Sequence, residues 1–273
     1  MHSWIDGQPA TAVNLQNRGL AYGDGLFETI AVRGGRPSLL SRHLERLALG
    51  CERLAIDIDL ALVRDELLRY ASQLGEGVAK LIVTRGDSQR GYAPAPGALA
   101  RRILQGGPRP AYPAGNAEQG IGLFDCQTRL AQQPLLAGLK HLNRLEQVMA
   151  RAEWQDSACA EGLMRDVQGH LIEGVYSNLF LVRDGVLLTA DLSRCGVAGV
   201  MRAALLDEAP ALGIEVRTGD LVQADLEAAD EVFVCNSVYG IWPVRTFAAL
   251  NLDWPAGPLT RKLQAVARTL LDT

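Results

Sequence analysis

Hydrophobic positions along this chain follow two spacings, one typical of amphipathic helices and one typical of short strands. Apolar residues three and four positions apart predict helices over residues 41–55, 60–74, 141–154 and 199–212. Short apolar runs bounded by turn-forming residues predict strands over residues 78–84, 120–124, 162–166, 178–182, 186–189 and 231–235. The first 35 residues are expected to form short strands, because Asp6-Gly7 and Gly34-Gly35 are hairpin-turn sequences.

Helices and strands are mixed in both halves of the chain, without a regular strand–helix–strand alternation. This order favours an α+β fold and argues against a doubly wound parallel sheet. The Gly- and Pro-dense stretch at 106–113 predicts an interdomain linker. We therefore expect a smaller N-terminal domain over residues 1–106, a linker over 107–116 and a larger C-terminal domain over 117–273.

The composition argues against several classes of protein. Of 273 residues, 48% are hydrophobic and 21% are charged, which is typical of a globular protein. The net charge of −4, with acidic and basic residues interspersed, indicates no nucleic-acid partner. No apolar run approaches the roughly 20 residues that span a bilayer. The first residues lack a basic segment followed by an apolar one, so we expect neither a membrane span nor a secretion signal.

Cysteine and histidine are too scattered to indicate a disulfide framework or a metal site. The five cysteines are odd in number and include no Cys-x-x-Cys pair, and the four histidines show no metal-ligand spacing. This pattern predicts buried thiols in the reducing cytoplasm and no bound metal.

Lysine is scarce, and one lysine lies where amine chemistry is plausible. Only Lys80, Lys140 and Lys262 are lysines among the 27 basic residues. Arginine cannot replace lysine where an amine must react with an aldehyde, because the guanidinium keeps its proton. Lys140 lies where an apolar loop meets the helix expected over 141–154, whereas Lys80 lies in a predicted strand. Arginine-rich codon usage is the alternative explanation of the low lysine count.

Three other features suit the same chemistry, although each also has a structural interpretation. Glu173 lies in an apolar stretch, where a buried carboxylate needs a partner; its alternative is a strand-end glutamate bonded to the backbone or to an arginine. Small residues before Val200 and Met201 leave backbone amides at a helix start, which suits a phosphate. Arg46 borders an apolar residue and can bind an oxyanion, or it belongs to a solvated helix face.

An amine, a carboxylate and an anion site together match what pyridoxal 5′-phosphate requires. Its aldehyde reacts with an amine, its ring nitrogen needs a carboxylate to stay protonated, and its phosphate needs hydrogen-bond donors. Each signal is weak alone, so the residues indicate this cofactor through their combination.

Local motifs strengthen this interpretation. Residues 18–29 read RGLAYGDGLFET, residues 43–47 read HLERL, residues 173–180 read EGVYSNLF and residues 199–202 read GVMR. In this order the segments resemble those of the fold-type IV pyridoxal-phosphate enzymes, which include branched-chain and D-amino-acid aminotransferases and aminodeoxychorismate lyases. The resemblance implies a two-domain α+β fold like that of D-amino-acid aminotransferase, with a small N-terminal α/β domain. It also implies a larger C-terminal domain with a mostly antiparallel, barrel-like sheet that carries the Schiff-base lysine.

The resemblance also assigns roles to individual residues. Lys140 matches the lysine that forms the Schiff base, and Glu173 matches the carboxylate at the ring nitrogen. The family's phosphate ligands correspond to Arg46, to the backbone amides of Val200 and Met201, and to Ser237. Five further residues are expected near the substrate, or as ion pairs and loop anchors: Tyr22, Thr29, Arg90, Tyr92 and Arg144.

Two segments are most similar to the lyase branch of this family. Residues 136–148 read LAGLKHLNRLEQV and residues 84–92 read TRGDSQRGY. The resemblance implies cleavage of 4-amino-4-deoxychorismate into 4-aminobenzoate and pyruvate, a step toward folate, by a cytoplasmic homodimer. One alternative is a pyridoxal-phosphate aminotransferase of D-amino acids or branched-chain amino acids. A second alternative is a non-catalytic pyridoxal-phosphate-binding α+β protein.

Overall fold

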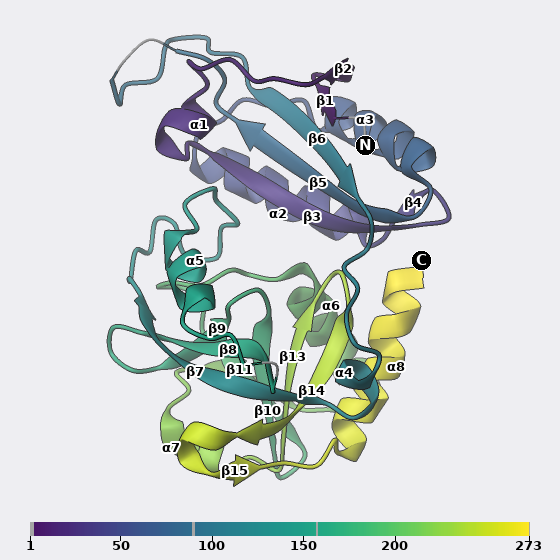
Figure 1. The fold of residues 1–273 in the computed structure, drawn as a ribbon, viewed down its shortest axis with the longest axis vertical. Helices are drawn as coiled ribbons and strands as arrows, with labels where there is room; N and C mark the ends of the chain where they lie inside the picture. Colours follow the sequence, from purple (N-terminus) through teal and green to yellow (C-terminus); the bar gives the residue numbers. More distant parts are fainter. Residues whose placement is uncertain (1–2, 89–90, 157, 273) are drawn as a thin grey trace. The chain divides into compact units, whose positions relative to one another are not determined.

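The computed structural model describes residues 3–88, 91–156 and 158–272, and the chain divides into two compact units (Figure 1). The first unit comprises Met1–Pro110, Leu139–Asn143 and Leu271–Thr273, and the second comprises Ala111–Gly138 and Arg144–Leu270. Lys140 thus groups by its contacts with the first unit, whereas the sequence-based division assigns it to the C-terminal domain.

The first unit is built on one six-stranded sheet, and all pairings between its described strands are antiparallel. In spatial order the strands are β2 (Gln8–Ala10), β1 (Ser3–Ile5), β6 (Arg101–Gly107), β5 (Gly77–Thr84), β3 (Gly25–Arg33) and β4 (Arg36–Pro37). The two expected hairpin turns join β1 to β2 and β3 to β4, and they are confirmed. Asp6, Gly7, Gly34 and Gly35 all have the positive φ that such turns require.

Helices α2 (Leu40–Arg53) and α3 (Leu60–Leu74) cover one face of this sheet (Figure 1). Ile30 of β3 and Leu47 of α2 are buried in the shared core, and burial of each such side chain contributes about 1.5–3 kcal/mol. Glu28 lies two residues before Ile30, on the same face of β3, and it is buried as well. A carboxylate on this face needs partners inside the core.

Two helices of the first unit begin where the sequence pattern did not place them. The short helix α1 (Arg18–Tyr22) lies in a segment expected to hold only strands, and the Asn17 side chain caps it by accepting from the Gly19 amide. Five residues are too few for a helical period to show in the sequence. Helix α2 begins at Leu40, one residue before the expected start at residue 41, and it follows Leu39, which has a φ of 54°.

In the second unit six strands close into a ring, in which each strand pairs with the next and the last pairs with the first. In order around the ring they are β10 (Asn178–Arg183), β13 (Glu231–Asn236), β14 (Gly240–Phe247), β7 (Ile121–Leu130), β8 (Cys159–Asp166) and β9 (Leu171–Gly174). Four of the six pairings are antiparallel. The predicted α+β class and the mostly antiparallel, barrel-like sheet are therefore confirmed.

Three more strands extend the ring: β11 (Val186–Ala190), β12 (Val216–Gly219) and β15 (Leu252–Asp253). The helical segments are α4 (Gly115–Glu118), α5 (Leu145–Ala152), α6 (Val200–Glu208), η1 (Pro210–Leu212), α7 (Gln223–Glu227), η2 (Ala248–Leu250) and α8 (Pro258–Asp272). In the described part of the chain, no helix combines the length and apolar character needed to cross a membrane.

Two predicted helices are shorter than the hydrophobic spacing indicates. The helix expected over 141–154 is α5, which begins only at Leu145, and the helix expected over 199–212 is α6, which ends at Glu208. Pro210 begins the separate 3-10 helix η1. Proline lacks the N–H and the space that continuation of an α-helix requires.

Asp59 caps the N-terminus of α3, and this role can be tested directly. Its side chain accepts hydrogen bonds from the amides of Ala61 (2.9 Å) and Leu62 (3.1 Å), which have no partner within the helix. Asp59→Ala is expected to lower the free energy of unfolding by about 1 kcal/mol, measured by urea denaturation. Asp57→Ala is the control, because Asp57 is equally exposed but precedes the cap; equal losses in both variants would contradict the capping role.

Candidate functional site

Lys140 does not lie in a helix. It belongs to a short extended segment that is hydrogen-bonded to β3. The Phe27 amide donates to the Lys140 carbonyl (2.9 Å), and the Leu142 amide donates to the Gly25 carbonyl (3.0 Å). The Lys140 ammonium lies 4.4 Å from the centroid of the Phe27 ring, and the Lys80 ammonium lies 5.2 Å from the same centroid. An ammonium over a ring face is stabilised by the ring quadrupole. The backbone of Lys140 is therefore fixed, and its half-buried amine is held over an aromatic side chain.

Beneath the same strand, Glu28 is bonded to two residues of α2. Its Oε1 accepts from Arg46 Nε (2.9 Å), and its Oε2 lies 2.6 Å from His43 Nδ1 and is also bonded by Arg46 Nη2. Burial alone would raise the pKa of Glu28, but the Arg46 charge and the His43 hydrogen bond lower it from 4.5 to about 2. Arg46 is therefore oriented by a carboxylate that stays ionised at neutral pH.

His43 is the neutral member of this group. Burial lowers the pKa of its imidazole, and the hydrogen bond with Glu28 only partly opposes that effect. The neutral ring carries its proton on Nδ1, because that nitrogen faces the ionised carboxylate. The buried group therefore contains one negative and one positive charge, which offset each other.

Two of the predicted substrate residues lie together elsewhere in the first unit. The rings of Tyr22 and Tyr92 have centroids 5.5 Å apart. The buried Arg18 holds them: its guanidinium lies 4.9 Å from the centroid of the Tyr22 ring and donates to the carbonyls of Gly91 (3.0 Å) and Tyr92 (2.8 Å). Arg90, also predicted near the substrate, lies outside the described residues. Thr29 is half-buried on β3, on the same face as Phe27.

In the second unit, Glu173 and Asn178 hold one peptide segment from both sides. The Val197 amide donates to Glu173 Oε2 (2.8 Å), and Asn178 Nδ2 donates to the Val197 carbonyl (2.9 Å). Glu173 is only 3% exposed. Gly196 precedes this segment with a φ of +82°, and an added Cβ would lie 2.8 Å from Ile172. A side chain at position 196 would therefore displace the backbone that meets the carboxylate.

The start of α6 follows the same segment and leaves its first amides available to an anion. Gly199 caps the helix without a side-chain hydrogen bond, and the first turn contains no acidic residue. An added Cβ at Gly199 would lie 1.9 Å from Asn178 Oδ1, so only glycine permits this close approach. The amides of Val200 and Met201 therefore lie at the positive end of the helix dipole, where a phosphate is stabilised.

Arg144 and Ser237 complete the predicted set in this unit. Burial lowers the pKa of the Arg144 guanidinium, while the charges of Glu173 and Glu146 oppose that effect. Ser237 is half-buried directly after β13, in a turn where Asn236 Oδ1 accepts from the amides of Val238 (2.9 Å) and Tyr239 (3.0 Å). The structure thus groups Arg144 with Glu173 by their electrostatic interaction, and it places Ser237 at the end of a barrel strand.

Sequence reasoning missed the residues that support the predicted ones. Glu28 shares its strand face with Leu26 and Ile30, which are buried. That alternation is visible in the sequence and marks a carboxylate directed into the core, for which His43 and Arg46 are nearby candidates as partners. Phe27, under the Lys140 amine, carried no comparable signal, because an aromatic residue in a strand most often serves packing.

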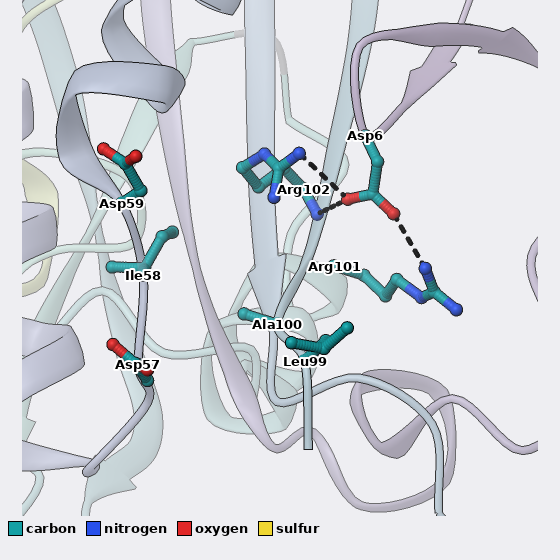
Figure 2. Close-up of a pocket in the computed structure, with 8 residues that line it drawn as sticks. All are labelled: Asp6, Asp57, Ile58, Asp59, Leu99, Ala100, Arg101 and Arg102. Atoms are coloured by element: carbon teal, nitrogen blue, oxygen red, sulfur yellow. Dashed lines mark hydrogen bonds and ion pairs between the residues drawn. The ribbon is translucent and has the colours of Figure 1, made fainter. Parts of the chain in front are cut away.

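The pocket in Figure 2 lies in the first unit and has a volume of about 460 Å³. It is lined by Asp6, Asp57, Ile58, Asp59, Leu99, Ala100, Arg101 and Arg102, none of which belongs to the predicted site. Asp6 Oδ2 accepts from the Arg101 guanidinium (2.9 Å), and Asp6 Oδ1 accepts from the Arg102 amide (3.0 Å). Because its arginines bond to acidic groups of the fold, we assign this pocket no role in catalysis.

Comparison with known proteins gives a consistent result. Residues 25–247 match the family described as amino-transferase class IV. An aminodeoxychorismate lyase from Vibrio harveyi is 38% identical over 97% of this chain and 99% of its own length. The crystal structure of 4-amino-4-deoxychorismate lyase from Pseudomonas aeruginosa is 60% identical, with a TM-score of 0.96, over 99% of this chain and 100% of that one. A branched-chain amino acid aminotransferase structure from Escherichia coli is 25% identical, with a TM-score of 0.85, over 99% and 94%.

The buried Glu28 predicts a specific dependence of stability on acid. Because the pKa of Glu28 falls from 4.5 to about 2 on folding, the unfolded chain binds its proton more tightly between these pH values. The contribution of Glu28 to the free energy of unfolding should therefore be fully present above about pH 4.5, and it should be lost as the pH falls toward 2. Glu28→Gln should be less stable at neutral pH and should show a flatter acid profile in urea titrations. Glu45→Gln, on the exposed side of α2, is the control and should keep the parent slope.

Proposed function

This chain belongs to the amino-transferase class IV family, and we propose that it is a pyridoxal-phosphate-dependent aminodeoxychorismate lyase. It would convert 4-amino-4-deoxychorismate into 4-aminobenzoate and pyruvate. The observation that carries this assignment is the 60% identity, over 99% of the chain, with the lyase structure from Pseudomonas aeruginosa. The identity with branched-chain aminotransferases is much lower, at 28% for the enzyme from Salmonella typhimurium.

The proposed binding residues have the chemistry that the cofactor requires. The start of α6 offers the amides of Val200 and Met201, and Gly199 before them packs directly against Asn178. Glu173 offers a buried carboxylate, and Lys140 offers an anchored amine. When bound, pyridoxal phosphate supplies an aldehyde for a primary amine and a ring that accepts electrons from the carbon beside that amine.

Lys140 is the proposed catalytic residue. Its Nζ would form the covalent bond that holds the cofactor, and the free amine would accept the proton from the substrate carbon that bears the amino group. The bonds from the Phe27 amide to the Lys140 carbonyl and from the Leu142 amide to the Gly25 carbonyl tie the lysine backbone to β3, so the amine needs little reorganisation between these two tasks. Loss of that proton and of the enolpyruvyl group leaves an aromatic ring, so the elimination needs no second keto-acid substrate.

The phosphate is the proposed ligand of Arg46, of the amides of Val200 and Met201, and of Ser237. Arg46 is suited to this role because Glu28 fixes its guanidinium through two nitrogens. An arginine held in one orientation loses less conformational entropy when it binds an oxyanion. The helix amides add the favourable end of the dipole.

Glu173 is proposed to keep the ring nitrogen protonated. A buried positive ring is stable only beside an opposite charge, and the Val197 hydrogen bond fixes one oxygen of this carboxylate. The two carboxylates of the substrate are the proposed partners of Arg90, Tyr92 and Arg144, with Tyr22 and Thr29 as further lining residues. The cation of Arg144 and the loop held by Arg18 support this assignment.

We also propose that the enzyme acts as a homodimer in the cytoplasm. All five cysteines are free thiols, and four of them are buried, which suits a reducing compartment. Burial raises the pKa of the Cys195 and Cys235 thiols to about 12, so these thiols stay protonated and unreactive.

The first test of the proposed function locates the cofactor and identifies the reaction. Borohydride reduction of the protein with pyridoxal phosphate, followed by peptide mapping, should find the adduct at Lys140. An adduct at Lys80 or Lys262 would contradict the assignment. Lys140→Ala should lose turnover of 4-amino-4-deoxychorismate by at least about a thousandfold, because the variant lacks the amine proposed both to bond the cofactor and to accept the proton.

The same assay separates the lyase from the alternatives. The parent protein should form 4-aminobenzoate and pyruvate without an added keto acid. A requirement for a keto acid, with D-amino or branched-chain amino acids as donors, would indicate an aminotransferase. Binding of pyridoxal phosphate without turnover of either substrate class would indicate a non-catalytic carrier.

Glu173→Gln tests the proposed role at the ring nitrogen. The amide keeps the shape and a hydrogen-bond acceptor for Val197, but it removes the charge that favours ring protonation. We expect kcat to fall by at least about a hundredfold while pyridoxal phosphate stays bound, the pattern of an interaction needed mainly in the transition state. Steady-state kinetics at saturating cofactor measure this effect. Turnover near the parent rate would show that Glu173 is structural.

A further inference from the structure

One buried carboxylate of the second unit takes no part in the steps above. Glu161 lies in β8 and is 0% exposed. Its Oε1 accepts from the amides of Gly162 (2.9 Å) and Val175 (3.0 Å), and its Oε2 accepts from the Ser177 hydroxyl (2.6 Å). Val175 and Ser177 belong to the turn that connects β9 to β10. The carboxylate therefore holds this turn, residues 174–177, from its buried side.

The turn approaches the carboxylate so closely that one position must be glycine. An added Cβ on Gly174 would lie 2.3 Å from Ser177 Oγ and 2.8 Å from the Glu161 carboxyl group. The Gly174 amide donates to the Ser177 carbonyl (2.8 Å), which closes the turn. Glu161 and the turn are thus in direct contact, with no room for a side chain at Gly174.

The two residues that flank this turn are those that bind the backbone of Val197. Glu173 directly precedes the turn and Asn178 directly follows it, and the two residues are register partners between β9 and β10. Glu173 receives the Val197 amide, and Asn178 binds the Val197 carbonyl. Two residues after Val197, Gly199 caps α6, which begins at Val200. A shift of the turn would therefore move the carboxylate and the helix start together.

The turn is also bonded to the segment that contains Ser237. Asn236 Nδ2 donates to the Tyr176 carbonyl (3.3 Å), and Asn236 Oδ1 accepts from the amides of Val238 and Tyr239. Asn236 thus links the turn to the backbone on both sides of Ser237. Three elements proposed to bind the cofactor meet at this one turn.

We propose that Glu161 is a positioning residue, whose buried carboxylate fixes the turn 174–177 and thereby places Glu173, the start of α6 and Ser237 for pyridoxal phosphate. This inference rests on the proposed function, because it assumes that these three elements bind that cofactor. Glu161 itself touches neither cofactor nor substrate in this proposal. Its effect is transmitted through the hydrogen bonds to Val175 and Ser177.

Burial disfavours the charge of Glu161, and its hydrogen bonds partly oppose that effect. Burial raises the pKa of Glu161 to about 7, although the Ser177 hydroxyl and the amides of Gly162, Tyr176 and Val175 lower it. Burial, together with the Glu161 charge, raises the pKa of Tyr112, Tyr176 and Tyr239. These phenols therefore keep their protons near neutral pH, and Glu161 is the acidic group among them that can ionise there.

The test compares two glutamates that are both buried and both bonded to backbone amides. Glu161→Gln keeps one oxygen acceptor but replaces the other oxygen with an NH2 group, which cannot accept the hydrogen bonds that the carboxylate accepts. Glu231→Gln is the matched control: Glu231 is 5% exposed and accepts from the amides of Leu259 (3.1 Å) and Thr260 (2.7 Å) at the start of α8. Titration of the apoproteins with pyridoxal phosphate, followed by visible absorption, gives the affinity. Thermal melting of the same apoproteins reports stability separately.

We expect Glu161→Gln to weaken pyridoxal phosphate binding at least about tenfold, the effect of losing one charge-assisted hydrogen bond, with an altered absorption maximum. Glu231→Gln should stay within about twofold of the parent affinity even if its melting temperature falls. Ser177→Ala removes one hydrogen-bond donor to Glu161 and should also weaken pyridoxal phosphate binding. It replaces Glu161→Gln in the comparison if that variant does not fold.

Affinities of Glu161→Gln and Ser177→Ala within twofold of the Glu231→Gln value would overturn the positioning role. A parent protein that binds no pyridoxal phosphate would overturn the proposed function instead. The parent titration and the variant comparison thus separate the two failures.

Discussion

The second unit depends on the backbone of one residue, Val197, which is hydrogen-bonded on both sides. Its amide is held by Glu173 and its carbonyl by Asn178, and these two residues are the register partners through which β9 meets β10 and the ring closes. The residues that close the sheet are therefore also the residues that fix the backbone before α6. A barrel with a different register at this position would separate the carboxylate from the helix amides.

In the first unit, a buried charge with its partners links β3 to α2. Glu28 is buried under the sheet, and its cost of desolvation is offset by Arg46 and His43. The opposite face of the same strand presents Phe27 to the Lys140 amine. Alternation along β3 thus places the Glu28–Arg46 ion pair on the core side of the strand and the Phe27 ring, beside the Lys140 amine, on the other side.

Much of this organisation was predictable from local pattern. The hairpin turns at Asp6-Gly7 and Gly34-Gly35 and the helix α3 follow from turn chemistry and helical spacing. The extended conformation of Lys140 was not predictable, because it is fixed by hydrogen bonds to Phe27 and Gly25, more than 100 residues earlier in the chain. Glu173 was proposed from its apolar neighbours, but its bond to Val197 is equally non-local. Spacing reports the periodicity of an element, whereas the partners of a buried polar group depend on how distant segments meet.

The scarcity of lysine has a consequence for the protein as a chemical target. An aldehyde reacts with any accessible amine, so a protein rich in lysine is modified at many positions when the aldehyde is in excess. Here the side-chain amines number three; two of them lie over the Phe27 ring, and the third, Lys262, donates to the Leu212 carbonyl (3.0 Å). Reagents that acylate or alkylate amines therefore find only three side-chain targets on this protein. Because two of these targets lie beside the same aromatic ring, modification by such reagents is concentrated around Phe27.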